Sequence, residues 1–564
     1  MSAVTRRTGA GAGLTTAALA LFVIAFGWVF SWTIAQWMST GTVAFVNPVE
    51  ALVGQVPWTG AHTAVMVGAG VIAAAIIAGV IVAVVRGDRA KEDRAAIHMG
   101  KGKEIAPLLP STVAKTHKHL GLDPKAHRGV QLGYTVAGNL PVRASFESTT
   151  TVIAGPRRNK SVALVIPNVL DAPGTCVTTS AKPDVLEATI GYRSTLGRVH
   201  VFDAQGIAPA YAEYGVWWNA LGEIRLLEDA ENLATILSAY YVSESRDQFF
   251  EKEGSRLLAD YMFAAAHARL YLPVVLEWLT TEDNPNPSRI LQESHPEVAA
   301  RIDAAQAVTE RTRSGVFTYA RGAVSFLASS ELRAWVQPGG NRREIVPKDL
   351  VASPRDTLYL LSKEGQGSAG PLVSALTKTI LDAAEVRAEA SPRARLTPPL
   401  MAVLDEAGNI CRIPDLPARY SHYGSRGIIV MTILQSQEQG EKVWPDGGFG
   451  ALWAASTVQV FAGGNASATF YRDLSERIGD YEYTEKSTST GKGGASNQVA
   501  RRSERIMDVR DLDSLSLGRM VVLASGARPT LVRTRPWFKD KRMKKLVAMT
   551  PEQNHRTAGE PSHV

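Results

Sequence analysis

The sequence predicts an α/β protein whose mostly parallel sheet carries helices on both faces, with an inserted all-α domain and two transmembrane helices at the N-terminus. Three patterns support this fold class. Short apolar runs alternate with helical stretches over most of the chain, which is typical of a parallel sheet buried on both faces. One long segment favours helices throughout, and two early segments are apolar and uncharged.

The composition indicates a globular chain of several domains. Its 564 residues are 45% hydrophobic and 20% charged, which excludes a disordered or collagen-like protein. The length exceeds that of one ordinary domain. Cys176 and Cys411 are the two cysteines. They are too few for a disulfide framework or a four-thiolate zinc site, and we interpret them as reduced core thiols without an assigned role.

Residues 13–38 and 63–85 are the two predicted membrane spans, and they define an N-terminal anchor over 1–90. Neither contains an ionisable side chain, and each exceeds the ~20 apolar residues that a bilayer requires. The alternatives are a cleaved signal peptide for the first run and a buried core helix for the second. Arginines precede the first span and follow the second, and residues 39–62 contain no Lys or Arg. This distribution places both termini and the bulk of the chain in the cytoplasm, on a cytoplasmic or inner membrane.

The rest of the chain divides into two halves of a sheet around a helical insertion. Residues 91–225 are predicted to hold a connector and the first strands, 226–351 the all-α insertion, and 352–548 the remaining strands. Residues 484–500 are polar and rich in Gly and Ser, which predicts a mobile loop, and 549–564 are predicted to be a disordered tail. The predicted strands are 150–154, 175–179, 199–203, 357–361, 400–404, 427–431, 457–461 and 520–524.

The first predicted strand ends in a turn suited to phosphate binding. A phosphate loop presents successive backbone amides at a helix N-terminus, a Lys for the outer phosphates and a Ser or Thr for Mg²⁺. Lys160 and Ser161 match the last two positions, whereas Ala154 and Asn159 replace the two glycines of G-x-x-x-x-G-K-[ST]. Asn tolerates a left-handed backbone, so the loop can still form; a basic strand-to-helix turn is the alternative. The predicted cradle consists of Gly155, Pro156, Arg157, Arg158, Asn159, Lys160 and Ser161.

Two later strand ends carry groups that complement this loop. Asp405 and Glu406 follow an apolar strand, where the first carboxylate would hold Mg²⁺ with Ser161 and the second would activate water. Gln435 follows the next strand and is predicted to sense the γ-phosphate, and Arg426 precedes that strand as a candidate arginine finger acting from a neighbouring subunit. ATP and Mg²⁺ are therefore the predicted cofactors. A strand-end Asp-Glu pair also occurs by chance, so the prediction depends on the combination.

Together these segments resemble the TraG/TraD coupling proteins of type IV secretion and conjugation systems. The similarity extends in order through the strings AGPRRNKSVALVIPNVL, TTSAKPDVLEAT, VFDAQG, VLDEAGNICRIPDLP and SRGIIVMTILQSQEQ, and the second and third strings are similar to an actinobacterial branch. The resemblance implies a RecA-like P-loop nucleotide-binding domain in a membrane-anchored, homo-hexameric ATPase. Its implied partners are relaxase-bound DNA, held without sequence specificity and single-stranded, and the components of a type IV secretion channel.

Two other functions stay open at this point. A membrane receptor with the same fold but no hydrolysis is motivated by the replaced glycines. An FtsK-like translocase shares the sheet, the ring and the anchor, but the helical insertion argues against it. Candidate DNA contacts are Arg157, Arg158, Arg501 and Arg502, and the basic stretch 533–545 could touch DNA or anionic lipid.

Overall fold

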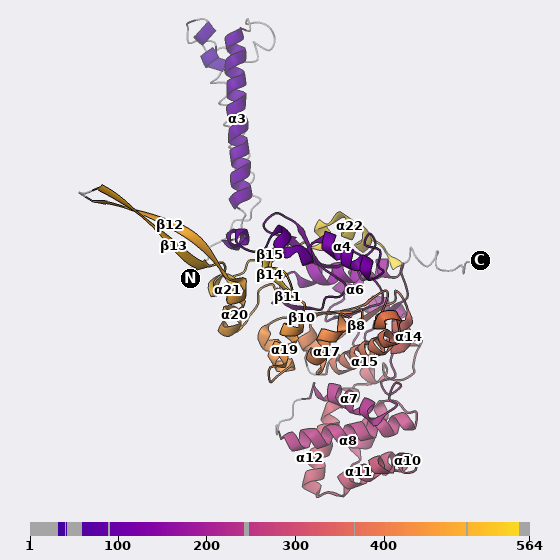
Figure 1. The fold of residues 1–564 in the computed structure, drawn as a ribbon. Coiled ribbons are helices and arrows are strands. Elements are labelled where there is room, and N and C mark those ends of the chain that lie inside the picture. The colour runs from indigo at the N-terminus through magenta and orange to yellow at the C-terminus, as the bar shows by residue number, and fades with distance from the viewer. Residues whose placement is uncertain are drawn as a thin grey trace, which may run out of the picture. The chain divides into compact units, whose positions relative to one another are not determined.

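The computed structural model describes residues 32–35, 37–39, 41, 59–87, 91–241, 247–365, 367–491 and 494–551. The chain divides into two compact units, Met1–Lys91 and Glu92–Val564. Helix α3 (Gly60–Gly87) forms most of the described part of the first unit (Figure 1).

The predicted membrane spans fall in this first unit. Residues 63–85 lie within α3, and residues 13–38 lie almost entirely outside the described residues, as does most of the predicted tail 549–564. Among the residues that the structure describes, no helix combines the length and the apolar character needed to cross a membrane. The membrane anchor therefore stays a prediction.

An eleven-stranded sheet organises the second unit, in the order β2-β1-β15-β14-β11-β3-β10-β9-β4-β8-β5. The strands from β11 to β5 are parallel, and the other four extend one edge in antiparallel fashion. The sheet is therefore mixed but mostly parallel, as the alternating pattern predicts. The parallel strands are β3 (Thr150–Ile153), β4 (Cys176–Ser180), β5 (Val199–Phe202), β8 (Thr357–Leu361), β9 (Leu400–Leu404), β10 (Ile428–Leu434) and β11 (Val458–Phe461); the antiparallel ones are β1 (Val130–Thr135), β2 (Pro141–Ala144), β14 (Arg519–Ala524) and β15 (Thr530–Arg533).

A hydrophobic core lies on each face of this sheet, because successive residues of a strand point to opposite sides. Val152 of β3 packs in one core and Ile153 in the other. The first core also contains α5 (Ile166–Leu170), α6 (Asp184–Arg193) and part of α22 (Lys541–Val547). The second contains α15 (Gly370–Glu389), α16 (Ala407–Ile410), α17 (Leu416–Tyr423), α19 (Gly448–Ala455) and α20 (Ala468–Ile478). Figure 1 shows the two layers above and below the strands.

The segment that the sequence predicts to be all-α forms a bundle of helices between β6 (Val216–Trp217) and β8 (Figure 1). Tyr261, Phe317 and Trp278 pack edge to face in its interior. A short strand, β7 (Arg343–Glu344), pairs with β6 and interrupts the helical pattern near its end. The helices of the bundle are α7 (Leu227–Ser238), α8 (Gln248–His267), α9 (Pro273–Thr280), α10 (Asn286–Leu291), α11 (Pro296–Ala307), α12 (Glu310–Ala323) and α13 (Ser330–Arg333). The last helix of the segment, α14 (Pro347–Ala352), lies beside α15 (Figure 1).

The prediction of a mobile loop at 484–500 is wrong. β12 (Asp480–Gly491) and β13 (Gly494–Arg505) pair along their whole length as an antiparallel ribbon (Figure 1). The sequence here is polar throughout, so it lacks the alternation of apolar and polar residues that marks a strand with one buried face. Backbone pairing does not depend on that alternation. At the base of the ribbon Tyr481 stacks on His98, with ring centroids 4.0 Å apart.

Candidate functional site

The candidate site lies where β3, β10 and β9 end. These strands are parallel neighbours, so the segments that follow them meet at one edge of the sheet, the edge at which open α/β sheets bind ligands. β3 leads to Lys160 and Ser161, β9 leads to Asp405 and Glu406, and β10 leads to Gln435. The structure thus brings together five residues that the sequence pattern selects from three separate segments.

Hydrogen bonds and ion pairs join these five side chains. Lys160 Nζ donates to Glu406 Oε1 and lies 3.5 Å from Asp405 Oδ1. Ser161 Oγ donates to Asp405 Oδ2 at 3.4 Å, and Gln435 Nε2 donates to Glu406 Oε2 at 2.6 Å. A single cation is therefore held between two carboxylates, with a hydroxyl on one carboxylate and an amide on the other.

Burial decides the protonation behaviour of this cluster. It raises the pKa of Asp405 to about 6, and the nearby Glu406 acts in the same direction while Lys160 opposes it. Burial by itself lowers the pKa of Lys160, but the two carboxylates more than offset that effect and raise it. Lys160 is consequently protonated at neutral pH, and Asp405 ionises within the physiological range.

The loop backbone explains how the two replaced glycines are accommodated. Asn159 has φ +63° and Arg157 has φ +60°, so the loop does use the left-handed conformation that the position of Asn159 predicts. Ala154 extends strand β3 instead: its N–H donates to Leu434 O at 2.9 Å, and its side chain is fully buried. An alanine therefore costs no backbone strain at the first position.

A second glycine loop, residues 463–464 after β11, supports the phosphate loop from behind. Gly155 N–H donates to Gly463 O at 2.7 Å. A Cβ on Gly155 would lie 3.0 Å from Gly464 Cα, and one on Gly464 would lie 2.9 Å from Gln435 O. Arg158 also packs here, with Nη1 donating to Leu515 O at 2.5 Å. No sequence pattern predicts this support, and its local signal is a glycine pair soon after a strand.

Arg426 is the one predicted catalytic residue that the structure does not bring to the cluster. It precedes β10, whereas Gln435 follows it, and the seven residues of β10 separate the two ends by about 20 Å. At the opposite edge Arg426 pairs with Glu389, Nη1 to Oε1 at 2.5 Å, and lies 3.8 Å from Glu385. Within one chain it cannot reach Lys160.

The donors at this site suit a magnesium nucleotide. In the described part of the chain, no group of three or more His, Cys, Asp or Glu residues could hold a metal ion unaided. Mg²⁺ commonly takes one or two carboxylates together with phosphate oxygens and water. Ser161 Oγ and the Asp405 carboxylate supply oxygens of that kind, next to a lysine and a helix start suited to phosphate.

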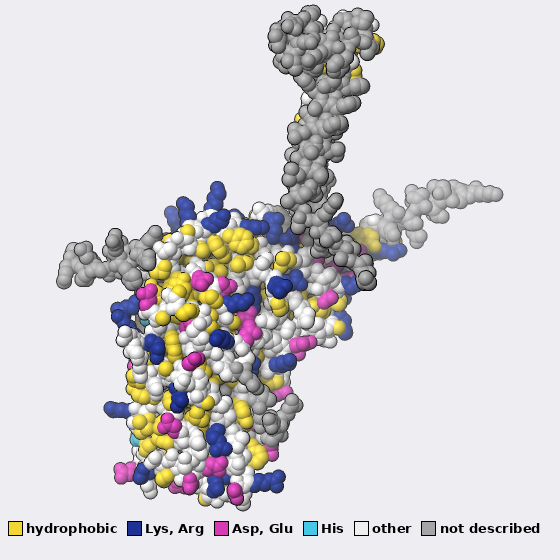
Figure 2. Space-filling view, turned by 180° about the vertical axis from the view of Figure 1, so that it is seen from behind, with side chains coloured by type: hydrophobic (Ala, Val, Ile, Leu, Met, Phe, Trp, Pro, Cys, Tyr) yellow, Lys and Arg dark blue, Asp and Glu magenta, His cyan; other side chains and the backbone are white. Residues whose placement is uncertain are grey.

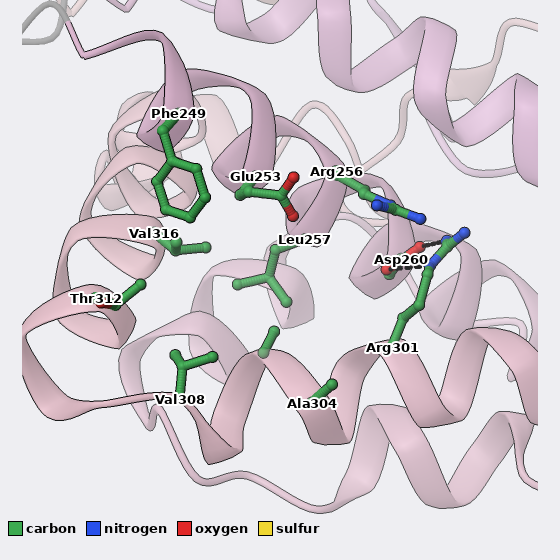
Figure 3. A pocket seen from close by; sticks show the side chains of 11 residues that line it. Phe249, Glu253, Arg256, Leu257, Asp260, Arg301, Ala304, Val308, Thr312 and Val316 are labelled. Carbon is green, nitrogen blue, oxygen red and sulfur yellow. Dashed lines mark hydrogen bonds and ion pairs between the residues drawn. The ribbon is translucent and has the colours of Figure 1, made fainter.

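A separate cavity of about 230 Å³ lies in the helical bundle between α8, α11 and α12 (Figure 3). Phe249, Leu257 and Val308 give it a largely apolar lining, and Asp260 pairs with Arg301 at one end. Burial raises the pKa of Asp260 to about 6 against the opposing effect of Arg301. The cavity shares no residue with the cluster around Lys160.

Comparison with known proteins gives one family match and several structural ones. Residues 399–516 match the family described as the TraM recognition site of TraD and TraG. This range includes Asp405, Glu406 and Gln435 but not the phosphate loop. Among curated proteins, none matches the sequence.

The structural matches are to crystal forms of a bacterial conjugative coupling protein, TrwBdeltaN70. The unbound monoclinic form has a TM-score of 0.52 and 18% identity over 72% of this chain and 88% of the other. The trigonal form in complex with sulphate has a TM-score of 0.54 and 17% identity, over 76% of this chain and 92% of the other. The structure of plasmid coupling protein TrwB in complex with ADP and Mg²⁺ has a TM-score of 0.51 and 17% identity, over 72% of this chain and 89% of the other. At this identity the likeness establishes a common fold, and nothing in it supports an actinobacterial branch.

Proposed function

Because this chain belongs to the TraG/TraD coupling-protein family, we propose that it is an ATPase that recruits relaxase-bound DNA and delivers it to a type IV secretion or conjugation channel. One observation carries the proposal: Lys160, Ser161, Asp405, Glu406 and Gln435 form one connected cluster at the carboxyl edge of the sheet. P-loop NTPases use a lysine for the phosphates, a hydroxyl and an acidic side chain for Mg²⁺, and a polar residue that orients water.

Each residue has a distinct task in the proposed reaction. Lys160 would hold the outer phosphates of ATP, and Ser161 and Asp405 would hold Mg²⁺. Bound Mg²⁺ supplies positive charge that offsets the charge on the transferring phosphoryl group. Glu406, released from Lys160, orients a water molecule and accepts its proton, while Gln435 holds the second oxygen of that carboxylate. The helix that begins beside Lys160 adds its dipole to anion binding.

The backbone favours turnover over a non-hydrolysing receptor. Ala154 lies in extended backbone, and Asn159 is among the non-glycine residues best suited to φ near +63°. Neither replacement removes the backbone path of a phosphate loop. We therefore propose that the loop binds ATP and that the chain hydrolyses it.

The test is the DNA-stimulated ATPase activity of the full chain in detergent or nanodiscs. Glu406→Gln should lower kcat by about 10²–10⁴-fold, the usual contribution of a general base, and Lys160→Ala should weaken nucleotide binding. Glu438→Gln is the matched control, since Glu438 is exposed on neighbouring helix α18 (Gln437–Val443). Equal rates in wild type, Lys160→Ala and Glu406→Gln would overturn the proposal.

The proposed assembly is a homo-hexamer in which Arg426 completes the site of the next subunit. The position of Arg426 at the opposite edge of the sheet supports action between subunits. Mixing Arg426→Ala chains with Glu406→Gln chains tests this, because mixed rings contain some sites with both groups intact. Activity should recover on mixing; no recovery contradicts a role in a neighbouring site.

We also propose that residues 13–38 and 63–85 anchor the protein in the cytoplasmic membrane, with both termini and the bulk of the chain in the cytoplasm. Single cysteine substitutions in 39–62, labelled from outside the cell, test this topology.

Single-stranded DNA would be held by charge alone. Figure 2 shows Lys and Arg side chains projecting from the upper end of the body. Binding that weakens steeply with salt and ignores sequence is the expected result.

A further inference from the structure

Glu406 lies in a closed circuit of hydrogen bonds. Gln435 Nε2 donates to Glu406 Oε2 at 2.6 Å, and Asn409 Nδ2 approaches the same oxygen at 3.5 Å. Gln439 closes the circuit: its Nε2 donates to Asn409 Oδ1 at 2.6 Å, and its Oε1 accepts the backbone N–H of Gln435 at 2.8 Å. Of the three amide side chains, the sequence pattern selects only Gln435.

Gln439 is held rigidly in this circuit. Its backbone N–H donates to Ser436 Oγ at 3.1 Å, in the cap that begins α18. Its side chain lies directly on the backbone of α16, since a Cβ on Gly408 would fall 2.4 Å from Gln439 Cδ. A glycine at 408 is what permits this contact. The amide group of Gln439 is therefore held by two hydrogen bonds and by its contact with α16.

Glu406 needs such support because its own backbone is strained. Its φ is +55°, a left-handed conformation that non-glycine residues rarely adopt. Its two carboxylate oxygens also have different partners: Oε1 bonds to Lys160, and Oε2 bonds to the amides of the circuit. When Lys160 turns to phosphate, Oε1 becomes free to accept a proton while Oε2 stays fixed.

We propose that Gln439, acting through Asn409 and Gln435, is a positioning residue that aims the Glu406 carboxylate. The proposal rests on the ATPase function proposed above. Gln439 does not touch the Glu406 side chain itself, so its effect is on the orientation of the base and not on nucleotide affinity.

Steady-state kinetics of the full chain test this role. Gln439→Met keeps the length of the side chain and removes both of its hydrogen bonds. We expect kcat to fall about 10-fold or more and KM for ATP to stay within about 2-fold, since the lost interaction acts in the transition state. Added to Glu406→Gln, the same substitution should cause no further loss. The proposal is overturned if the kcat of the double variant falls below that of Glu406→Gln by the same factor as in the single variant. It is also overturned if the kcat of Gln439→Met is no lower than that of the control.

Gln437→Met is the matched control. Gln437 lies on the same helix, but its side chain bonds to Glu441 and to the backbone of Ser467, away from the circuit. It reports the general cost of losing a buried amide on α18.

A nucleotide-free measurement separates this proposal from the ATPase function. In thermal unfolding without ATP, the Tm shifts of Gln439→Met and Glu406→Gln should be non-additive, as for residues in one network, and those of Gln437→Met and Glu406→Gln should add. Additive shifts for Gln439→Met overturn the positioning role. Absence of turnover in the wild type overturns the proposed function, and the Tm comparison still decides the role of Gln439.

Discussion

Removing the charge of Lys160 should make the protein sensitive to alkaline pH. Lys160→Met keeps the length of the side chain but leaves Asp405 and Glu406 side by side without a cation. Lys160 lies 3.5 Å from Asp405, and at an effective dielectric constant near 20 their attraction is on the order of 5 kcal/mol. Without it the buried Asp405 stays protonated well above its wild-type pKa.

The size of the loss in unfolding free energy follows from the proton that Asp405 keeps in the variant. In the wild type the pKa of Asp405 is about 6, so at pH 6 the variant loses little by keeping Asp405 protonated. Each pH unit above 6 costs the variant about 1.4 kcal/mol relative to wild type. The difference in unfolding free energy should therefore reach about 3 kcal/mol at pH 8, two units above the wild-type pKa. The sign is fixed because the variant binds its proton more tightly when folded.

Urea unfolding at pH 6, 7 and 8 measures this difference, with midpoints and slopes compared between wild type and Lys160→Met. Lys252→Met is the control, since Lys252 is exposed on α8. A free-energy difference that is the same at pH 6 and pH 8 would refute the reasoning, and so would an equal pH trend in Lys252→Met.

Three further predictions concern other parts of the second unit. Asn159→Val should weaken nucleotide binding and lower the unfolding free energy by about 1–2 kcal/mol, because a β-branched residue resists a positive φ, whereas Asn159→Gly should bind as well as wild type in an equilibrium titration. Tyr240→Phe should lower the unfolding free energy by about 1–3 kcal/mol in urea titration, since it leaves the N–H of Arg412, which donates to the Tyr240 hydroxyl at 3.0 Å, without that partner. Burial lowers the pKa of His117, so its contribution is intact above its ordinary pKa and is lost as the pH falls below it; the Tm of wild type should drop more between pH 7 and pH 5 than that of His117→Gln.

Each of these has a contrary result. Equal binding by Asn159→Val and Asn159→Gly would show that the left-handed conformation at 159 is not required. Unchanged stability in Tyr240→Phe would mean that the hydrogen bond of the hydroxyl, between the segment after α7 and the segment after α16, does not stabilise the fold. An equal acid shift in His117→Gln would contradict the neutral ring, in which Nδ1 donates to His127 O and Nε2 accepts the N–H of Phe146.

The local sequence pattern was sufficient to predict the parallel strands and most residues of the candidate site. A run of apolar β-branched residues predicts a buried strand wherever it lies in the chain, and the residues after it must lie at the carboxyl edge. For this reason Lys160, Asp405 and Gln435 could be selected from three distant segments.

Of the antiparallel strands, β14 was predicted at 520–524, whereas the other three and the ribbon were harder to predict for a different reason. β1, β2 and β15 lie within a region of mixed composition or near a basic stretch, and their register depends on partners far along the chain. In the polar strands β12 and β13, Tyr481 at the base of the ribbon packs against a core, and the polar sequence beyond it shows no strand pattern. Backbone hydrogen bonds specify no side chain, so a strand of this kind leaves little trace in composition.

The sequence by itself therefore determined the alternating α/β plan and the identity of the groups that would meet phosphate, because strand periodicity and strand-end chemistry are local properties. Only the tertiary structure decided which groups surround them. The order of the strands places β11 beside β3, which sets Gly463 and Gly464 behind the phosphate loop. The packing of α18 on α16 sets Gln439 behind Glu406. These neighbours arise from long-range packing, which no short window of sequence contains.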